Sequence, residues 1–261
     1  MHRRNLVHLI HYVLQGCREA LQHLIFWPDE ASIQTFHRDF APNLQPYFEN
    51  VAFAVDGMEI RVCWMRRKGP GMKINYSGKK RQYSRNVMVM VMLDGRITYL
   101  SSDSHLLSDQ GLWNALQLRN YFIGSWWGVL GDGGFYFNPA HHIQQEEDRI
   151  NGFTPYKRGP ENNYTLSPEQ KAFNNHLSKL RVVVEDTISC MKKFSVIRGI
   201  YRHYSMNKAR SSLPLDLVVH VIGLLTNFHL GKSPIRGRNW RVDRRTITER
   251  RHGLQNFVIE L

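Results

Sequence analysis

The chain has 261 residues, 42% hydrophobic and 22% charged, which fits an ordinary globular protein of one large domain or two small ones. Its 35 Lys and Arg against 22 Asp and Glu give a formal charge of +13, which favours a polyanionic partner, first nucleic acid and then a membrane surface, over a merely basic protein. Three distant cysteines without a C-x-x-C pair argue against a disulfide framework or a zinc site, and no apolar run approaches the ~20 residues of a membrane-spanning helix.

The N-terminal part of the sequence predicts helices. Apolar residues recur every three or four positions over residues 5–26, as in one or two amphipathic helices. Pro28 is placed near the first turn of another short helix. We therefore expect a helical lead-in over residues 1–50 that packs on the domain following it.

From residue 51 the pattern changes to strands. Residues 51–55 form a continuous apolar run, typical of a strand buried on both faces, and residues 59–65 alternate as a second strand. Asp56 and Gly57 stand between them. Asp-Gly is a common hairpin turn, but an ionised Asp at the rim of a core is costly unless it is paired or binds a cation. The two interpretations remain open at this point.

The middle of the chain alternates strands with loops. Residues 86–93 and 96–100 predict a hairpin around Asp94-Gly95, and Ser108 or Asp109 is expected to cap a helix. Residues 126–130 form another short apolar strand that ends in a carboxylate, Asp132, within a glycine-rich turn. The polar segment 140–165 predicts a loop.

The C-terminal part predicts helices and a basic tail. Ser167 caps a helix of about ten residues that ends near Lys179, and a second helical face over residues 181–194 carries Glu185 at its edge. Residues 215–225 predict a largely buried helix. Residues 231–261 are expected to form a basic C-terminal tail.

Three carboxylates form the candidate site. If the strands that end at Asp56 and Asp132 are parallel neighbours, both side chains reach one edge of the sheet, and a helix packed there brings in Glu185. Such a group repels itself unless cations neutralise it, and oxygen-rich clusters suit Mg²⁺ or Mn²⁺. Two such ions about 3.5–4 Å apart can drive phosphodiester cleavage. By spacing alone the pattern is not specific, because any chain offers many carboxylate triples.

The sequence also resembles the DDE endonuclease domain of Harbinger-type transposases and their domesticated relatives. The resemblance covers residues 51 to about 230, in the family's order. It rests on residues 55–57 (VDG), 76–80 (YSGKK), 94–97 (DGRI), 131–135 (GDGGF), 173–174 (FN), 177–178 (LS), 181–185 (RVVVE), 188–189 (IS) and 191–192 (MK).

The resemblance implies an α/β, RNase H-like fold, with a mixed central sheet flanked by helices, over residues 51–230. It implies that Asp56, Asp132 and Glu185 are catalytic and hold two Mg²⁺ or Mn²⁺ ions. Asp109 lies near the place of a further family Asp, with a helix cap as the alternative. The implied activity is metal-dependent cleavage, and transfer, of DNA strands in the nucleus. Related systems depend on a separate Myb-like protein for DNA binding and nuclear entry, and a homodimer is a further option.

Basic residues near the site are candidates for phosphate contacts. Lys79, Lys80 and Arg81 lie in a predicted loop, and Lys192 and Lys193 follow Glu185 by two helical turns. A solvated loop is the alternative for the first group. The rival function is a catalytically inactive derivative that keeps the fold and binds DNA or protein.

Overall fold

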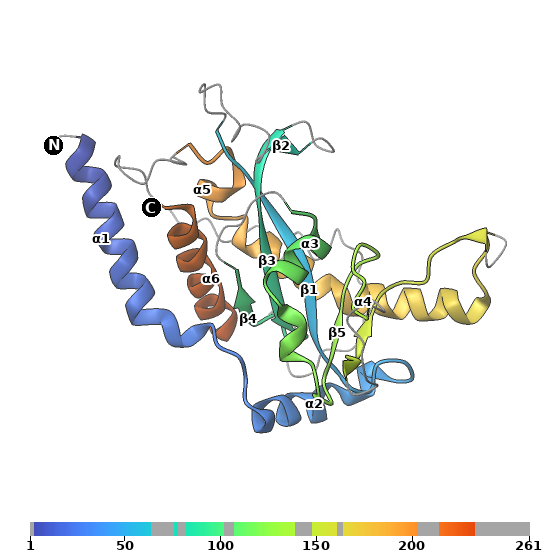
Figure 1. Ribbon diagram of the computed structural model, residues 1–261. Helices are drawn as coiled ribbons and strands as arrows, with labels where there is room; N and C mark the ends of the chain where they lie inside the picture. Colours follow the sequence, from blue (N-terminus) through green and yellow to red (C-terminus); the bar gives the residue numbers. More distant parts are fainter. Residues whose placement is uncertain are drawn as a thin grey trace.

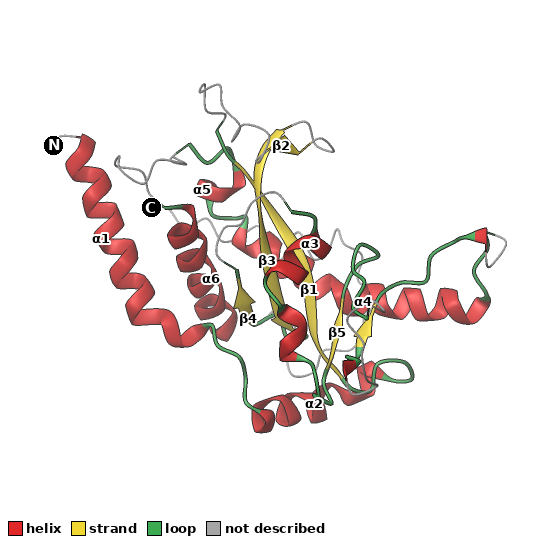
Figure 2. Cartoon of the chain, in the orientation of Figure 1, coloured by secondary structure: helices red, strands yellow, loops and turns green. Residues whose placement is uncertain are grey.

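A computed structural model describes residues 3–63, 76–77, 82–101, 107–138, 148–160, 164–202 and 214–232. It shows a mixed sheet with helices on both sides (Figures 1 and 2). The predicted DNA contacts Lys79, Lys80 and Arg81 lie outside the described residues, as does the predicted basic tail beyond residue 232.

The central strand is β1 (Val51–Arg61), which runs without interruption through Asp56 and Gly57. Here the prediction of two strands separated by a turn is wrong. Asp56 is the register partner of Val89, and Gly57 that of Met88, on the antiparallel strand β3 (Gln82–Met92). Since residues 51–55 are fully buried, pairing with neighbouring strands outweighs the local preference of Asp-Gly for a turn.

The remaining strands extend the sheet in both directions from β1 and β3. The predicted hairpin is confirmed, because β4 (Ile97–Leu100) pairs antiparallel with β3. The two-residue β2 (Tyr76–Ser77) pairs with the start of β3. On the other side, β5 (Gly128–Leu130) runs parallel to β1, and β6 (Gly152–Phe153) runs parallel to β5. The strand β6 lies in a segment predicted as loop, and its two residues are too few for a periodic signal.

The predicted helical lead-in is confirmed. It consists of α1 (Arg3–Leu21), the short 3₁₀ helix η1 (Gln22–Leu24) and α2 (Glu30–Leu44). Pro28 precedes α2 rather than standing in its first turn, because the Asp29 carboxylate caps this helix by accepting from Ser32 N–H at 2.8 Å. Figure 1 shows α1 lying along α6 (Leu215–Lys232). The Asn227 side chain of α6 accepts from Ile97 N–H at 2.8 Å and donates to the carbonyls of Leu24 and Ile97, so it joins the lead-in to β4.

The long helix α4 (Pro168–Met191) is continuous over 24 residues, where the sequence predicted a break near Lys179. Ser167 caps its start, as predicted, and it forms a capping box with Gln170. Its buried residues, among them Leu177, Leu180 and Val184, make one stripe that extends to Met191, so the helix packs on the sheet over its C-terminal part. This stripe explains why the helix does not end at Lys179.

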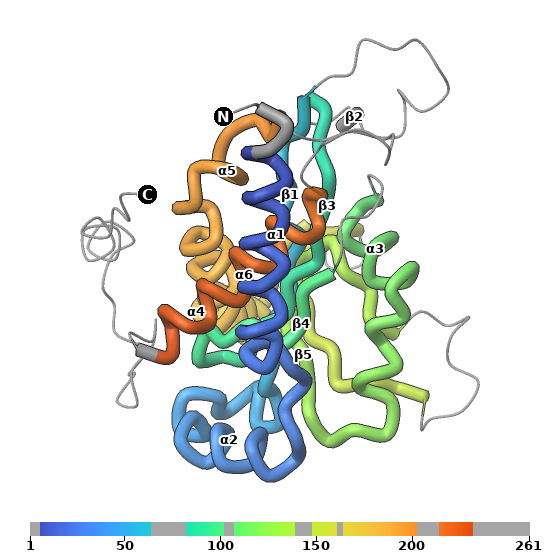
Figure 3. Tube along the Cα trace, turned by 90° about the vertical axis from the view of Figure 1, so that its left-hand side faces the viewer, coloured from blue at the N-terminus to red at the C-terminus, as the bar shows by residue number. Residues whose placement is uncertain are grey.

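Helices lie on both faces of the sheet. Figure 3 shows α4 and α6 on one side and α3 (Asp109–Ala115) on the other. The 3₁₀ helix η3 (Leu118–Tyr121) follows α3, and α5 (Ser195–Arg198) follows α4. None of the described helices is long and apolar enough to span a membrane.

Candidate metal centre

Asp56 is a carboxylate held inside the sheet. Its side chain is 21% exposed, and its Oδ1 accepts a hydrogen bond from Gly57 N–H at 2.8 Å. Burial raises the pKa of Asp56 to about 6 from its ordinary 3.8, against the lowering effects of Arg181 and of the Gly57 N–H, while the nearby Asp109 and Asp132 raise it further. At Asp56, the effect of burial on the pKa therefore outweighs that of the neighbouring Arg181.

Asp132 reaches the same place from the parallel neighbour of β1. Ala54 is the register partner of Leu130, so Asp56 and Asp132 each lie two residues further along adjacent strands. Asp132 stands just beyond the end of β5, where its Oδ1 accepts from Gly134 N–H at 2.7 Å. This hydrogen bond fixes the carboxylate at the edge of the sheet.

Asp109 is the third carboxylate beside Asp56 and Asp132, and it comes from the helix α3 rather than from a strand. Ser108, not Asp109, caps α3, because its hydroxyl accepts from Gly111 N–H at 3.1 Å. Asp109 is the first residue of α3, and its Oδ1 accepts from Asn86 Nδ2 at 2.8 Å. A Cβ atom on Gly57 would lie only 1.9 Å from this Oδ1. The absence of a side chain at position 57 is thus what admits the Asp109 carboxylate.

These three carboxylates form a compact acidic cluster. One oxygen from each of Asp56, Asp109 and Asp132 lies within 4.8 Å of the other two, and each residue is partly buried. Ligand oxygens around an octahedral Mg²⁺ at 2.0–2.1 Å are separated by about 3 to 4 Å. The cluster therefore fits one such ion after a small inward adjustment of the side chains. Its all-oxygen donor set is the kind that Mg²⁺ and Mn²⁺ prefer.

Glu185 lies beside the acidic cluster rather than within it. Its side chain is 56% exposed, and its Oε1 is 3.8 Å from Arg181 Nη2. The same nitrogen is 3.6 Å from Asp56 Oδ2, so a single guanidinium stands between Asp56 and Glu185. Arg181 is largely buried, and its Nε has no hydrogen-bond partner among the described residues. The region between Asp56 and Glu185 is thus filled by a protein cation.

Sequence reasoning missed three contributors to the site. Arg181 was noted only as part of a motif, although an Arg four residues before a Glu on one helix is a signal for an ion pair. Nothing in the sequence signalled the hydrogen bond from Asn86 or the contact that makes Gly57 necessary. Lys192 and Lys193 lie at the C-terminal end of α4, half-buried, where their predicted role in phosphate binding stays a prediction.

The raised pKa of Asp56 predicts how metal binding depends on pH. A carboxylate must lose its proton to ligate a metal, so affinity for Mn²⁺ is expected to be constant above pH 7 and to fall by about tenfold per pH unit well below pH 6. Calorimetric titration with Mn²⁺ between pH 5 and pH 8 measures this. An affinity that stays level down to pH 5 would contradict the assignment of Asp56 as a ligand.

The comparisons with known proteins identify a family for this chain. A protein-family model described as DDE superfamily endonuclease matches residues 55–227, more than half of the chain. The match begins one residue before Asp56 and includes Asp109, Asp132 and Glu185. A search of curated proteins and a search of solved structures gave no match. From the extent of the family match, the chain belongs to the DDE superfamily endonucleases.

Proposed function

We propose that the protein is a metal-dependent DNA endonuclease or transposase of the Harbinger type, with an RNase H-like domain. The observation that carries this proposal is the acidic cluster of Asp56, Asp109 and Asp132, with its oxygens within 4.8 Å of one another. Three antiparallel strands followed by two parallel ones, in the order β4-β3-β1-β5-β6, support the RNase H-like assignment. The formal charge of +13 supports DNA as the polyanionic substrate.

In this proposal the acidic cluster holds the catalytic ion. Bound Mg²⁺ or Mn²⁺ would lower the pKa of the attacking water or 3′-hydroxyl and neutralise the leaving oxygen of the phosphodiester. Asp56 and Asp132, fixed by hydrogen bonds from Gly57 and Gly134, would hold the ion at the end of their strands. Glu185 would be a further ligand, for a second ion, if Arg181 left its position beside Glu185 and Asp56. Lys192 and Lys193 contact the DNA backbone from the end of α4.

One observation favours the inactive alternative. Arg181 already supplies a positive charge between Asp56 and Glu185, where a second ion would bind. A protein whose Arg181 never leaves that position would bind at most one ion and act as a DNA- or protein-binding derivative. Whether Arg181 leaves its position beside Asp56 and Glu185 therefore distinguishes the nuclease from the inactive binding protein.

A plasmid-nicking assay tests the proposed activity. The wild-type protein is expected to nick supercoiled DNA in Mg²⁺ or Mn²⁺, and Asp132→Ala to lose more than about 100-fold of the rate, since disturbing even an outer-shell partner of a metal site typically costs 10–100-fold. Asp39→Asn, an exposed carboxylate on α2, is the matched control and should nick like wild type. If wild type and Asp132→Ala nick equally in both metals, the enzyme proposal fails.

The partners and location are proposed on other grounds. Exposed apolar side chains on α1, namely Leu6, Leu9, Ile10 and Val13, support a homodimer through this helix, which light scattering measures. We further propose that the protein acts in the nucleus together with a Myb-like DNA-binding partner. Imaging of the tagged chain with and without such a partner tests that dependence.

A further inference from the structure

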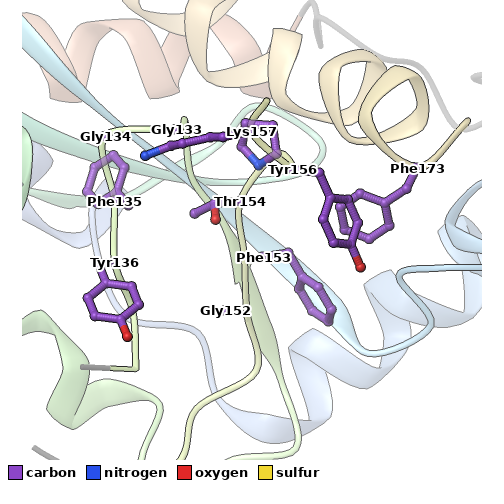
Figure 4. Close-up of a pocket in the computed structure, with 11 residues that line it drawn as sticks. Gly133, Gly134, Phe135, Tyr136, Gly152, Phe153, Thr154, Tyr156, Lys157 and Phe173 are labelled. Carbon is purple, nitrogen blue, oxygen red and sulfur yellow. The ribbon is translucent and has the colours of Figure 1, made fainter. Parts of the chain in front are cut away.

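An open pocket of about 550 Å³ lies next to the acidic cluster, and the family assignment gives it no role. Figure 4 shows it between residues 133–136, which follow Asp132, and residues 152–157, which include β6. Phe173 of α4 stands at its far end. The volume is within the range of pockets that bind small organic ligands. Gly133, which lines the pocket, directly follows Asp132 of the cluster in the chain.

Two helices fix the walls of the pocket. Asn174 of α4 accepts from Tyr156 N–H at 2.8 Å and donates to the Tyr156 carbonyl at 2.9 Å, a double clamp on one wall. Gln110 of α3 accepts from Tyr136 N–H at 2.5 Å and holds the other wall. Because α3 begins at Asp109, the pocket and the acidic cluster are positioned by the same element. The pocket is therefore formed before any ligand arrives.

The lining combines flat aromatic faces with a cation. Tyr136 and Tyr156 remain 62% and 48% exposed, and they stand on opposite walls in Figure 4. Tyr156 is supported by Phe173, with ring centroids 5.0 Å apart. The Lys157 side chain lies over Gly133: a Cβ added to Gly133 would be 3.4 Å from the lysine Cε. The ammonium group of Lys157 is therefore close to the turn that carries Asp132. A planar ring joined to an anion is the ligand that such a lining suits.

We propose that this pocket binds one nucleobase of the DNA strand whose phosphate a metal ion at the acidic cluster would hold. The base leaves its stack and lies against Tyr136 or Tyr156, with an adjoining phosphate near Lys157. This inference rests on the proposed function, because it places the scissile strand at Asp132. Extracting a paired base costs a few kcal/mol, so the substrate class it implies is DNA with an unpaired nucleotide beside the cleavage position.

Oligonucleotide binding without cleavage tests the pocket. A fluorescein-labelled single-stranded DNA is titrated with the full chain in Ca²⁺, which takes oxygen ligands in place of Mg²⁺, after a gel has shown that the DNA stays uncut, and fluorescence anisotropy gives Kd. Tyr156→Ala and Tyr136→Ala are each expected to weaken binding by about 5- to 100-fold, the usual loss for one stacked base. Tyr156→Phe keeps the ring and should bind like wild type. Tyr12→Ala, which removes a 79% exposed tyrosine from α1, is the matched control and should be unchanged.

Removal of single bases from the oligonucleotide locates the contact. At one position an abasic site is expected to weaken binding to wild type but not to Tyr156→Ala, because the ring and the base then act as one pair. Equal affinities for wild type, both alanine variants and every abasic oligonucleotide would overturn the inference. The nicking assay is a separate test. If the protein nicks DNA but shows no coupling between Tyr156 and a base, the proposed function stands and this inference fails. If the coupling is found without nicking, the protein binds DNA through a base pocket and the proposed enzyme activity fails.

Discussion

Asp56→Asn is expected to abolish metal-dependent nicking and, at the same time, to make the metal-free protein more stable. The pKa of Asp56 is raised to about 6, so its stabilising contribution is full below about pH 4 and is lost as the pH rises through 6. At pH 7.5 the ionised carboxylate therefore costs folding free energy, and a neutral amide of the same shape avoids that cost. A shift of about two pKa units corresponds to about 1–3 kcal/mol. Thermal unfolding in EDTA measures the gain.

The control for this result is metal addition. Mn²⁺ should raise the Tm of wild type, because a ligand that binds only the folded state stabilises it, and should leave the Tm of Asp56→Asn unchanged. Asp39→Asn should follow wild type in both measurements, since Asp39 is exposed on α2. An Asp56→Asn protein that is less stable than wild type in EDTA would show that Asp56 supports the fold through its charge.

Gly57→Ala is expected to weaken Mn²⁺ binding by about 10- to 100-fold, through displacement of Asp109. The new Cβ would lie 1.9 Å from Asp109 Oδ1 and 2.7 Å from its Cγ, so the carboxylate has to rotate out of the acidic cluster. Overpacking of this kind also costs about 1–3 kcal/mol of stability. Calorimetric titration with Mn²⁺ and thermal unfolding measure the two effects.

A double-mutant cycle separates displacement of Asp109 from general damage. If Gly57→Ala acts through Asp109, it should add little to the loss of Mn²⁺ affinity already caused by Asp109→Asn. Gly16→Ala is the matched control, because among the described residues nothing beyond the adjacent backbone of α1 lies within 4 Å of an added Cβ there, and alanine favours the helix. Full additivity of the two substitutions would contradict the mechanism.

The sequence predicted where strands and helices occur better than it predicted how far each one continues. The apolar run at residues 51–55 correctly predicted a buried strand, because burial on both faces leaves a compositional trace. The continuation through Asp56 and Gly57 depends on hydrogen bonding to β3, which is distant in sequence. Likewise α4 was split near Lys179 because polar residues interrupt its pattern locally, whereas packing on the sheet decides its length.

The candidate site shows the same division. Asp56 and Asp132 could be named as candidates from the sequence, since each follows a buried apolar run. Their meeting depends on β1 and β5 being parallel neighbours, which the sequence left as a condition and the structure shows. The position of Asp109 depends on Asn86, which is 23 residues away in sequence, and on the space left by Gly57. The ion pairs of Arg181 depend on the rotation of α4 against β1. Contacts of this kind arise from packing and leave no local pattern.

Because α4 is continuous, it fixes the distances between its residues that would lie along a bound DNA strand. It carries Asn174 at the pocket, Arg181 beside the acidic cluster and Lys192 at its end, and at 1.5 Å per residue these span about 27 Å. That length corresponds to about eight base-pair steps of duplex DNA. Because the buried stripe of α4 begins at Leu177, inserting one residue after Asn174 would turn Asn174 by about 100° relative to Arg181 and direct it away from Tyr156. The distances between these three residues along the helix and the directions in which they point around it therefore cannot change independently.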